Sequence, residues 1–335
     1  MENEASPRRA TVVTLSELAG VAPSTVTRAL RGDTRISEAT RARILKLAEQ
    51  HGYAPNALAR TLSSGRSGLY GLVLGPASNP FYAELLHEAV REAKERGVRL
   101  LIIHAGDGPI EDTTAESLLH YQVDGCIITS AVLSSRAAEI CAANRVPLIM
   151  VNRVARHHGC FVTCDNHAGG AELAQLLLAG GRTKFAVVGT SSTSSTAVER
   201  EDGFVAELAR GGVAPMMHFD GHSSYEGGFA AGTAILENAV RPDAVFAVSD
   251  IMAMGVLDAL RLGGVSVPDQ MAVVGFDGVA EAARPIYDLT TIEQPLPLMV
   301  RRAFEMLAAR SGNHRLPDES ISLRGRLIPR GSTGR

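Results

Sequence analysis

Residues 11–30 read TVVTLSELAGVAPSTVTRAL and predict two short helices joined by a tight turn. Apolar residues recur at helical spacing over residues 12–19, and Gly20 then interrupts the pattern. Pro23 opens a second helix over residues 24–30, because a proline in the first turn lacks an N–H that would be unpaired anyway. A helix, a glycine-containing turn and a second helix are typical of a helix-turn-helix motif.

A third helix and a linker follow this motif. Ser37 is placed to cap the third helix, and Gly52 ends it. A short segment then leads into the Ser/Gly-rich residues 63–68, whose composition is typical of a linker. Because helix-turn-helix motifs bind DNA, we expect a DNA-binding head over residues 1–54. A short helix with a linker is expected over residues 55–68.

Net charge distinguishes the first 66 residues, the head with most of its linker, from the rest of the chain. Residues 1–66 hold ten of the 33 Lys and Arg residues but only six of the 36 Asp and Glu residues, so they carry +4 and the remainder carries −7. Such an asymmetry fits a basic module that meets a polyanion. It fits a solvated helical face equally well.

Composition sets the broad class. The 335 residues are 45% hydrophobic and 21% charged, which is typical of a folded protein of about two domains. No apolar run approaches the roughly 18 residues of a membrane-spanning helix, and the polar start lacks the apolar core of a secretory signal. With four cysteines and no such signal, we expect a cytoplasmic protein without membrane segments or structural disulfides. Binding of DNA by the helix-turn-helix would make it nucleoid-associated.

From residue 69 onward, short apolar runs alternate with amphipathic helical stretches. This alternation predicts parallel sheets covered by helices, and ligands bind such sheets at the carboxyl ends of the strands. The series divides near residues 152–161 into two similar halves. We expect an α/β body over residues 69–335 made of two doubly wound, Rossmann-like subdomains. The expected boundaries are 69–161 with 290–319 for the first, and 162–289 with 320–330 for the second.

Several motifs occur in a fixed order along nearly the whole chain. They are residues 11–30, Ile36–Arg41, His51–Arg60, Ser78–Tyr82, Val123–Gly125, Asp165–Asn166, Arg200, Val274–Asp277 and Leu289–Thr291. In this order they resemble the lactose-repressor/galactose-repressor (LacI/GalR) family of bacterial transcriptional regulators. The resemblance implies a helix-turn-helix head on a periplasmic-binding-protein-like body. It also implies a repressor that binds a palindromic operator as a homodimer under the control of a sugar or related metabolite.

The second helix carries the residues expected to meet DNA. They are Pro23, Ser24, Thr25, Thr27 and Arg28, because the early residues of this helix reach base edges in the major groove. Arg28 can donate two hydrogen bonds to a guanine, worth about 1–3 kcal/mol of discrimination. Ala22 departs from the family, which usually has a Ser cap at that position. The missing cap costs about 1 kcal/mol.

The expected hinge lies just beyond the head. The resemblance implies that Leu62 inserts into the minor groove at the centre of the site, with Asn56 and Ala59 nearby. Unstacking a base step costs a few kcal/mol, which contacts along the bent DNA offset. A helix this short is marginal alone, so we expect it to fold only on DNA and against a second hinge. A plain flexible linker is the alternative.

The resemblance also implies an effector cleft between the two halves of the body. Its expected residues are Phe81, Tyr82, Asn152, Arg200, Ser249 and Asp277. Arginine donates as a fork and aspartate accepts through two oxygens, which suits a polyhydroxylated or carboxylated ligand. Asp277 has a structural alternative, capping the turn that follows it. Asp250 is expected to cap its own helix rather than bind ligand.

Other classes of protein fit less well. His157, His158, Cys160, Cys164 and His167 suggest zinc by composition, but a strand over residues 161–163 separates the cysteines, so we expect no metal site. No GxGxxG follows a strand and no P-loop is present, so we expect neither a cofactor nor an enzyme. A periplasmic sugar-binding protein would share the two-lobed body but lack the basic head. The chain ends without a leucine-heptad tail, which favours a dimer over a tetramer.

Overall fold

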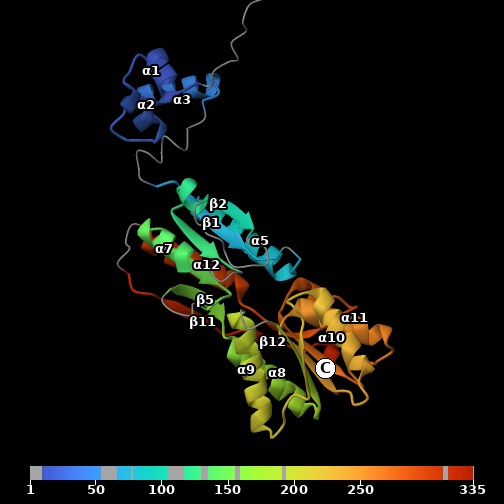
Figure 1. Cartoon of the computed structure of the whole chain (residues 1–335). Helices are drawn as coiled ribbons and strands as arrows, with labels where there is room; N and C mark the ends of the chain where they lie inside the picture. Colours follow the sequence, from blue (N-terminus) through green and yellow to red (C-terminus); the bar gives the residue numbers. More distant parts are fainter. Residues whose placement is uncertain are drawn as a thin grey trace, which may run out of the picture. The chain divides into compact units, whose positions relative to one another are not determined.

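The computed structural model describes residues 10–53, 66–76, 78–104, 117–129, 135–154, 159–190, 194–311 and 316–334. The chain divides into two units, residues 1–67 and 68–335, called here the head and the body (Figure 1). The division falls at the end of the expected linker. The expected hinge residues Asn56, Ala59 and Leu62 lie outside the described residues.

The head contains the helix-turn-helix predicted from the sequence. Its helices are α1 (Val12–Ala19), α2 (Pro23–Leu30) and α3 (Glu38–Gln50). Thr11 and Ser37 cap α1 and α3 through their side chains, whereas Ala22 gives α2 no side-chain cap. The three helices share a small apolar core made of Leu15, Ala19, Val26, Ala29, Ile44 and Ala48.

The body contains twelve strands in the part of the chain that the structure describes. The strands of the first lobe are β1 (Leu69–Leu74), β2 (Arg99–His104), β3 (Gly125–Ile128), β4 (Leu148–Val151), β5 (Cys160–Cys164) and β11 (Ser320–Leu323). Those of the second lobe are β6 (Phe185–Gly189), β7 (Met217–Asp220), β8 (Ala244–Ala247), β9 (Ala272–Asp277), β10 (Thr290–Glu293) and β12 (Arg326–Ile328).

Each lobe is built on one six-stranded sheet. The first has the order β11-β5-β4-β3-β1-β2 and the second β12-β10-β9-β8-β6-β7. All neighbouring strands are parallel except β10 and β12. The predicted α/β class with two parallel sheets is therefore confirmed.

Helices cover both sheets. The first lobe carries α5 (Pro80–Arg96), α7 (Ser135–Ala143) and α12 (Leu296–Arg310). The second carries α8 (Asn166–Ala179), α9 (Ser195–Arg210), α10 (Tyr225–Glu237) and α11 (Asp250–Leu262), together with the short 3₁₀ helices η1 (Ala280–Ala283) and η2 (Gly331–Thr333). In Figure 1, α8 lies beside α9 and α10 beside α11, and α12 returns to the first lobe, where it contacts α5, β4 and β5.

The chain crosses between the lobes at positions that differ from the expected boundaries. β10 was expected in the first subdomain but pairs with β9 in the second sheet. β11 was expected in the second subdomain but pairs with β5 in the first sheet, and the expected boundary at residue 161 falls inside β5. Apolar patterning indicates where a strand lies, but the sheet it joins depends on pairing with distant residues.

Two glycines hold α8 and α9 in close contact. A Cβ atom on Gly203 would lie 2.0 Å from the carbonyl oxygen of His167, and one on Gly170 would lie 2.0 Å from that of Arg200. Each close contact is therefore with the facing helix's backbone, which cannot move aside as a flexible side chain does. Because Arg200 belongs to α9, this contact fixes its position relative to α8.

We therefore expect Gly203→Ala to destabilise the body by about 1–3 kcal/mol, as overpacking does in a close-packed interior. Gly180→Ala is a matched control, because Gly180 has a φ of −75° and its added Cβ would meet nothing nearer than 3.4 Å. Urea unfolding of the two variants measures the difference. Equal stability in the two would contradict the contact.

Candidate functional site

One face of α2 is exposed. Pro23, Ser24 and Arg28 are exposed and Thr25 and Thr27 are half-buried. Val26 and Ala29 point into the head's core. All five residues expected to meet DNA therefore lie on the part of α2 that the core leaves accessible.

Part of the head's positive charge is used within the head. Arg43 donates to a carbonyl at the end of α1 at 2.8 Å, and Arg41 donates to two carbonyls in the loop before α3. Arg35 forms an ion pair with Asp33 at 2.7 Å and holds the pKa of that carboxyl well below its usual range. The charge count alone overstated the basic surface, while Arg28 remains on the exposed face of α2.

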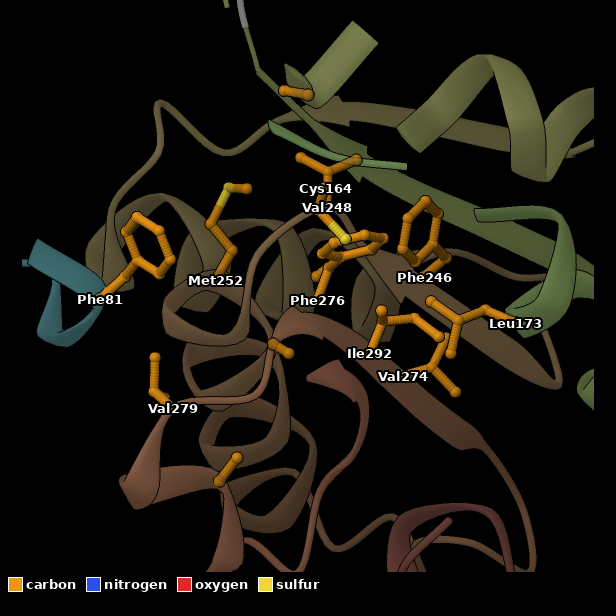
Figure 2. Close-up of a cluster of buried hydrophobic side chains, with 14 of the residues drawn as sticks. Phe81, Cys164, Leu173, Phe246, Val248, Met252, Val274, Phe276, Val279 and Ile292 are labelled. Atoms are coloured by element: carbon orange, nitrogen blue, oxygen red, sulfur yellow. The ribbon is translucent and has the colours of Figure 1, made fainter. Parts of the chain in front are cut away.

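Arg200 is the centre of the polar site in the body. It is only 4% exposed. Its Nη1 donates to Asp277 Oδ1 at 2.9 Å and to the carbonyl of Val248 at 2.8 Å, and its Nε donates to Asn166 Oδ1 at 2.9 Å. The guanidinium also lies 4.0 Å above the ring of Phe276, which is labelled in Figure 2. The cation is therefore fixed in place before any ligand arrives.

Asn152 is the residue of the first lobe that contacts Arg200. It directly follows β4, has a φ of 57°, and its Oδ1 lies 3.4 Å from Arg200 Nη2. The next residue, Arg153, donates to the hydroxyls of Ser194 and Thr196 at the start of α9, at 3.1 and 3.0 Å. Polar groups of both lobes therefore meet where β4 ends and α9 begins.

The two buried aspartates have different roles. The carboxylate of Asp277 accepts from Arg200 and, at 2.8 Å, from Gln294 Nε2. The carboxylate of Asp250 accepts from the amides of Gly278 and Val279, at 2.7 and 3.0 Å. Asp250 therefore caps the turn after β9 rather than its own helix, contrary to expectation, and Asp277 is left to bind Arg200.

Burial controls the electrostatics of this pair. Burial first, and then the neighbouring charge of Asp277, raise the pKa of Asp250 to about 7. Burial also raises the pKa of Asp277, although Arg200 opposes that shift. The site therefore holds its negative charge only because nearby donors stabilise it.

Apolar and hydroxyl groups complete the expected site. Phe81 and Tyr82, in the first turn of α5, are both buried, with ring centroids 5.5 Å apart in an edge-to-face arrangement. Figure 2 shows Phe81 facing Met252 and Val279 of the second lobe. The Ser249 hydroxyl is buried and has no hydrogen-bond partner among the described residues.

The expected set omitted Asn166, Arg153 and Gln294. Asn166 was part of a motif used for the resemblance, and Gln294 directly follows β10, at the sheet edge where β9 also ends. That position was the available signal, since polar residues after parallel strands gather at one edge. Among the described residues, no group of three or more His, Cys, Asp and Glu side chains is arranged to hold a metal; His157 and His158 lie outside them.

The helix-turn-helix head and the two-lobed body together define a class of DNA-binding transcriptional regulator. Residues 15–56 match the model of bacterial regulatory proteins of the lacI family, and residues 174–333 match that of the periplasmic binding protein-like domain. The chain belongs to the LacI family. Among the described residues, every helix is too short or too polar to span a lipid bilayer.

Known relatives support this assignment over the full length. The chain is 31% identical to the ribose operon repressor of Escherichia coli K12 over 328 residues, covering 96% of this chain and 99% of the relative. It is 28% identical to the transcriptional regulator CelR in a cellobiose complex, with a TM-score of 0.72 and coverage of 97% and 100%. A lac repressor dimer bound to operator and the anti-inducer ONPF has the same fold, with a TM-score of 0.89, 24% identity and coverage of 97% and 99%. These relatives are transcriptional regulators, not enzymes.

Proposed function

We propose that this regulator represses transcription in the bacterial cytoplasm by binding a palindromic operator as a homodimer. A small polyhydroxylated effector, a sugar or sugar acid, controls that binding. The observation that carries the proposal is the contact of Arg200 in the second lobe with Asn152 in the first. A ligand bound to both would change the angle between the lobes.

The head supplies the contacts to DNA. Arg28 reads a guanine, Pro23 and Ser24 contact neighbouring base edges, and Thr25 and Thr27 contact the backbone or bases beside them. The exposure of this face of α2 supports these roles. In the hinge, Leu62 enters the minor groove with Asn56 and Ala59 beside it, as the family resemblance implies.

The body supplies the effector site. Arg200 and Asp277 bind ligand hydroxyl or carboxylate oxygens, Asn152 and Ser249 bind further hydroxyls, and Phe81 and Tyr82 form the apolar wall. The unpartnered Ser249 hydroxyl supports this assignment, because an unsatisfied buried polar group costs about 1–3 kcal/mol that a ligand hydroxyl would recover. The names of the ribose repressor and the CelR–cellobiose complex point to the same ligand class.

Two exposed apolar residues on the second lobe support the homodimer. Leu262 is 80% exposed at the end of α11, and Ile286 is 60% exposed beside Tyr287. The Tyr287 hydroxyl donates to Asp258, one turn before Leu262, so the two apolar residues belong to adjoining segments. A homodimer with two-fold symmetry supplies two heads for the two half-sites of a palindrome.

The test uses the full-length protein and two measurements. A palindromic fragment from its own promoter region should bind at low ionic strength and dissociate as salt rises. A thermal-shift panel of pentoses, hexoses, disaccharides and sugar acids should contain a compound that stabilises the protein with the logarithm of its concentration and changes operator binding. Failure to bind the palindrome, or turnover of a stabilising compound, would overturn the proposal.

The hinge role has its own prediction. Leu62→Ala should leave the fold intact and weaken operator binding at least about tenfold, because it removes the wedge whose insertion allows the DNA to bend. A gel-shift titration measures the loss. Leu58→Ala removes a leucine four residues earlier in the expected hinge helix and is the control, which should bind the operator more tightly than the Leu62 variant. Unchanged affinity of the Leu62 variant would show that Leu62 does not insert into DNA and would favour the alternative of a plain flexible linker.

A further inference from the structure

Three segments carry the chain between the two lobes. β5 of the first sheet is followed at Asp165 by α8, and β10 of the second sheet is followed at Gln294–Pro295 by α12. The third segment, Arg324–Gly325, joins β11 of the first sheet to β12 of the second. They are called here the first, second and third crossovers. A change in the angle between two lobes is absorbed by a few residues at the ends of elements, so such a change must turn the backbone of these crossovers.

The three crossovers are packed against one another. A Cβ atom on Gly325 would lie 2.5 Å from Cγ2 of Ile292, near the end of β10, and 3.0 Å from Sγ of Cys164, at the end of β5. Cys164 and Ile292 are both labelled in Figure 2. The amide of Asp165 donates to the carbonyl of Leu323 at 2.8 Å. A turn of one crossover is therefore opposed by the other two unless all three turn together.

The first crossover is hydrogen-bonded to Arg200 through Asn166. This asparagine is buried, and its Oδ1 accepts from Arg200 Nε at 2.9 Å. Its Nδ2 donates to Thr163 Oγ1 at 3.1 Å and to Glu199 Oε2 at 3.0 Å. Because Arg200 Nε can only donate, a single orientation of the amide satisfies all three bonds. One side chain therefore ties β5 of the first lobe to the guanidinium on α9 of the second.

The second crossover is hydrogen-bonded to Asp277 through Gln294. The buried Gln294 side chain donates from Nε2 to Asp277 Oδ1 at 2.8 Å, and its backbone amide donates to the Asp277 carbonyl at 3.1 Å. Asp277 itself has a φ of 136°, which residues other than glycine rarely adopt. Such a conformation persists only where the surroundings fix it, and it is typical of ligand-binding and switch positions. The two crossovers are thus bonded to opposite members of the Arg200–Asp277 ion pair.

We propose that Asn166 and Gln294 are positioning residues, which couple the Arg200–Asp277 pair to the first and second crossovers. A hydrogen bond weakens steeply when it bends, so a shift of either charged group moves the crossover bonded to it or breaks the bond. The ion pair and the two amides form one buried chain of hydrogen bonds, in which each bond polarises the next.

This coupling gives the proposed effector its means of changing the angle between the lobes. A ligand oxygen that draws Arg200 or Asp277 toward itself changes the bonds to Asn166 and Gln294, and the packed crossovers then turn together. The role of a ligand in this device rests on the proposed function. The coupling itself is a property of the ligand-free protein.

The test is hydrogen–deuterium exchange of the full-length, ligand-free protein, measured by mass spectrometry. Gln294→Met and Asn166→Leu each remove one side-chain amide while keeping a side chain of similar size. Because the two residues are coupled through shared partners, we expect Gln294→Met to speed exchange at least about fivefold in residues 164–170, and Asn166→Leu to do the same in residues 293–298. The rates are compared with those of the buried strand β8, which report any loss of overall stability.

Two control variants make the result specific. Gln175→Met removes a glutamine amide further along α8, which donates to Glu207 Oε1 of α9 at 2.9 Å, and it should leave exchange in both crossovers unchanged. The background Arg200→Ala/Asp277→Asn cuts the link between the two positioning residues. In that background Gln294→Met should no longer affect the first crossover.

Other outcomes overturn the proposal. These are faster exchange confined to the substituted crossover, a distant effect that persists in the Arg200→Ala/Asp277→Asn background, or an equal effect of Gln175→Met. Gln294→Met and Asn166→Leu test the coupling from opposite ends, so one suffices if the other does not fold. Operator binding by the same variants keeps this result separate from the proposed function. Local effects alone with operator binding intact would reject the coupling, whereas coupled exchange without operator binding would reject the proposed function.

Discussion

Arg200→Ala should lower the free energy of unfolding of the body by about 3–5 kcal/mol, the usual cost of breaking a buried ion pair. The side chains of Arg200 and Asp277 are 5% and 4% exposed, so the substitution leaves a carboxylate buried with Gln294 as its remaining side-chain donor. The substitution also removes the guanidinium group that binds the proposed effector. We expect effector affinity to fall at least about tenfold, because a hydrogen bond to a charged group contributes about 1.5–3 kcal/mol. Denaturant unfolding and titration with the effector found in the thermal-shift panel measure the two losses.

The double variant Arg200→Ala/Asp277→Asn is the control. It removes the stranded charge together with its partner, so part of the lost stability should return while effector binding stays weak. pH gives a second check. Burial raises the folded-state pKa of Asp277, and loss of Arg200 raises it further, so the unpaired carboxylate favours protonation in the folded state. The Arg200→Ala defect should therefore be larger at pH 8 than at pH 5. A defect that is independent of pH and not relieved by Asp277→Asn would contradict the pairing.

Apolar runs predicted the central strands of both sheets, because these strands are buried on both faces and their sequences are continuously apolar. β3, β6, β8 and β9 are of this kind, with every residue buried. The apolar runs did not include β7, β10, β11 or β12. The sequence of β7, Met-His-Phe-Asp, lies at a sheet edge with alternate residues exposed, so it has no continuous apolar run. The lobe to which β10 and β11 belong was also not predictable, since it depends on pairing across long stretches of chain.

The site was predictable to a similar extent. Arg200, Asp277 and Asn152 were expected together, and the structure brings them into contact. The roles of Asp250 and Asp277 were not resolved by the sequence, because two buried carboxylates near one turn look alike until their donors are known. Gln294 was missed because no strand was predicted before it, so its place at the sheet edge where β9 ends could not be used. Its importance arises from the neighbouring end of β9.

Arg28→Ala should weaken binding to the cognate palindrome about tenfold to a hundredfold. A two-bond contact from arginine to guanine is worth about 1–3 kcal/mol of discrimination, and Arg28 is the arginine on the exposed face of α2. The same variant should lose much less affinity for a scrambled sequence, because non-specific binding depends on phosphate charge rather than base edges. Fluorescence-anisotropy titrations against both DNAs measure the ratio.

Arg35→Ala is the matched control for this ratio, because it also removes one positive charge from the head. Arg35 is 75% exposed but paired with Asp33 in the loop after α2, so it should leave the preference for the palindrome unchanged. If Arg28 only contributes charge, the two variants will weaken cognate and scrambled DNA alike, and the base-reading role is wrong. If Arg28 reads a guanine, only Arg28→Ala will lower the ratio of cognate to scrambled affinity. Substitution of that guanine in the operator will then have little further effect on the variant, because the two changes remove the same contact.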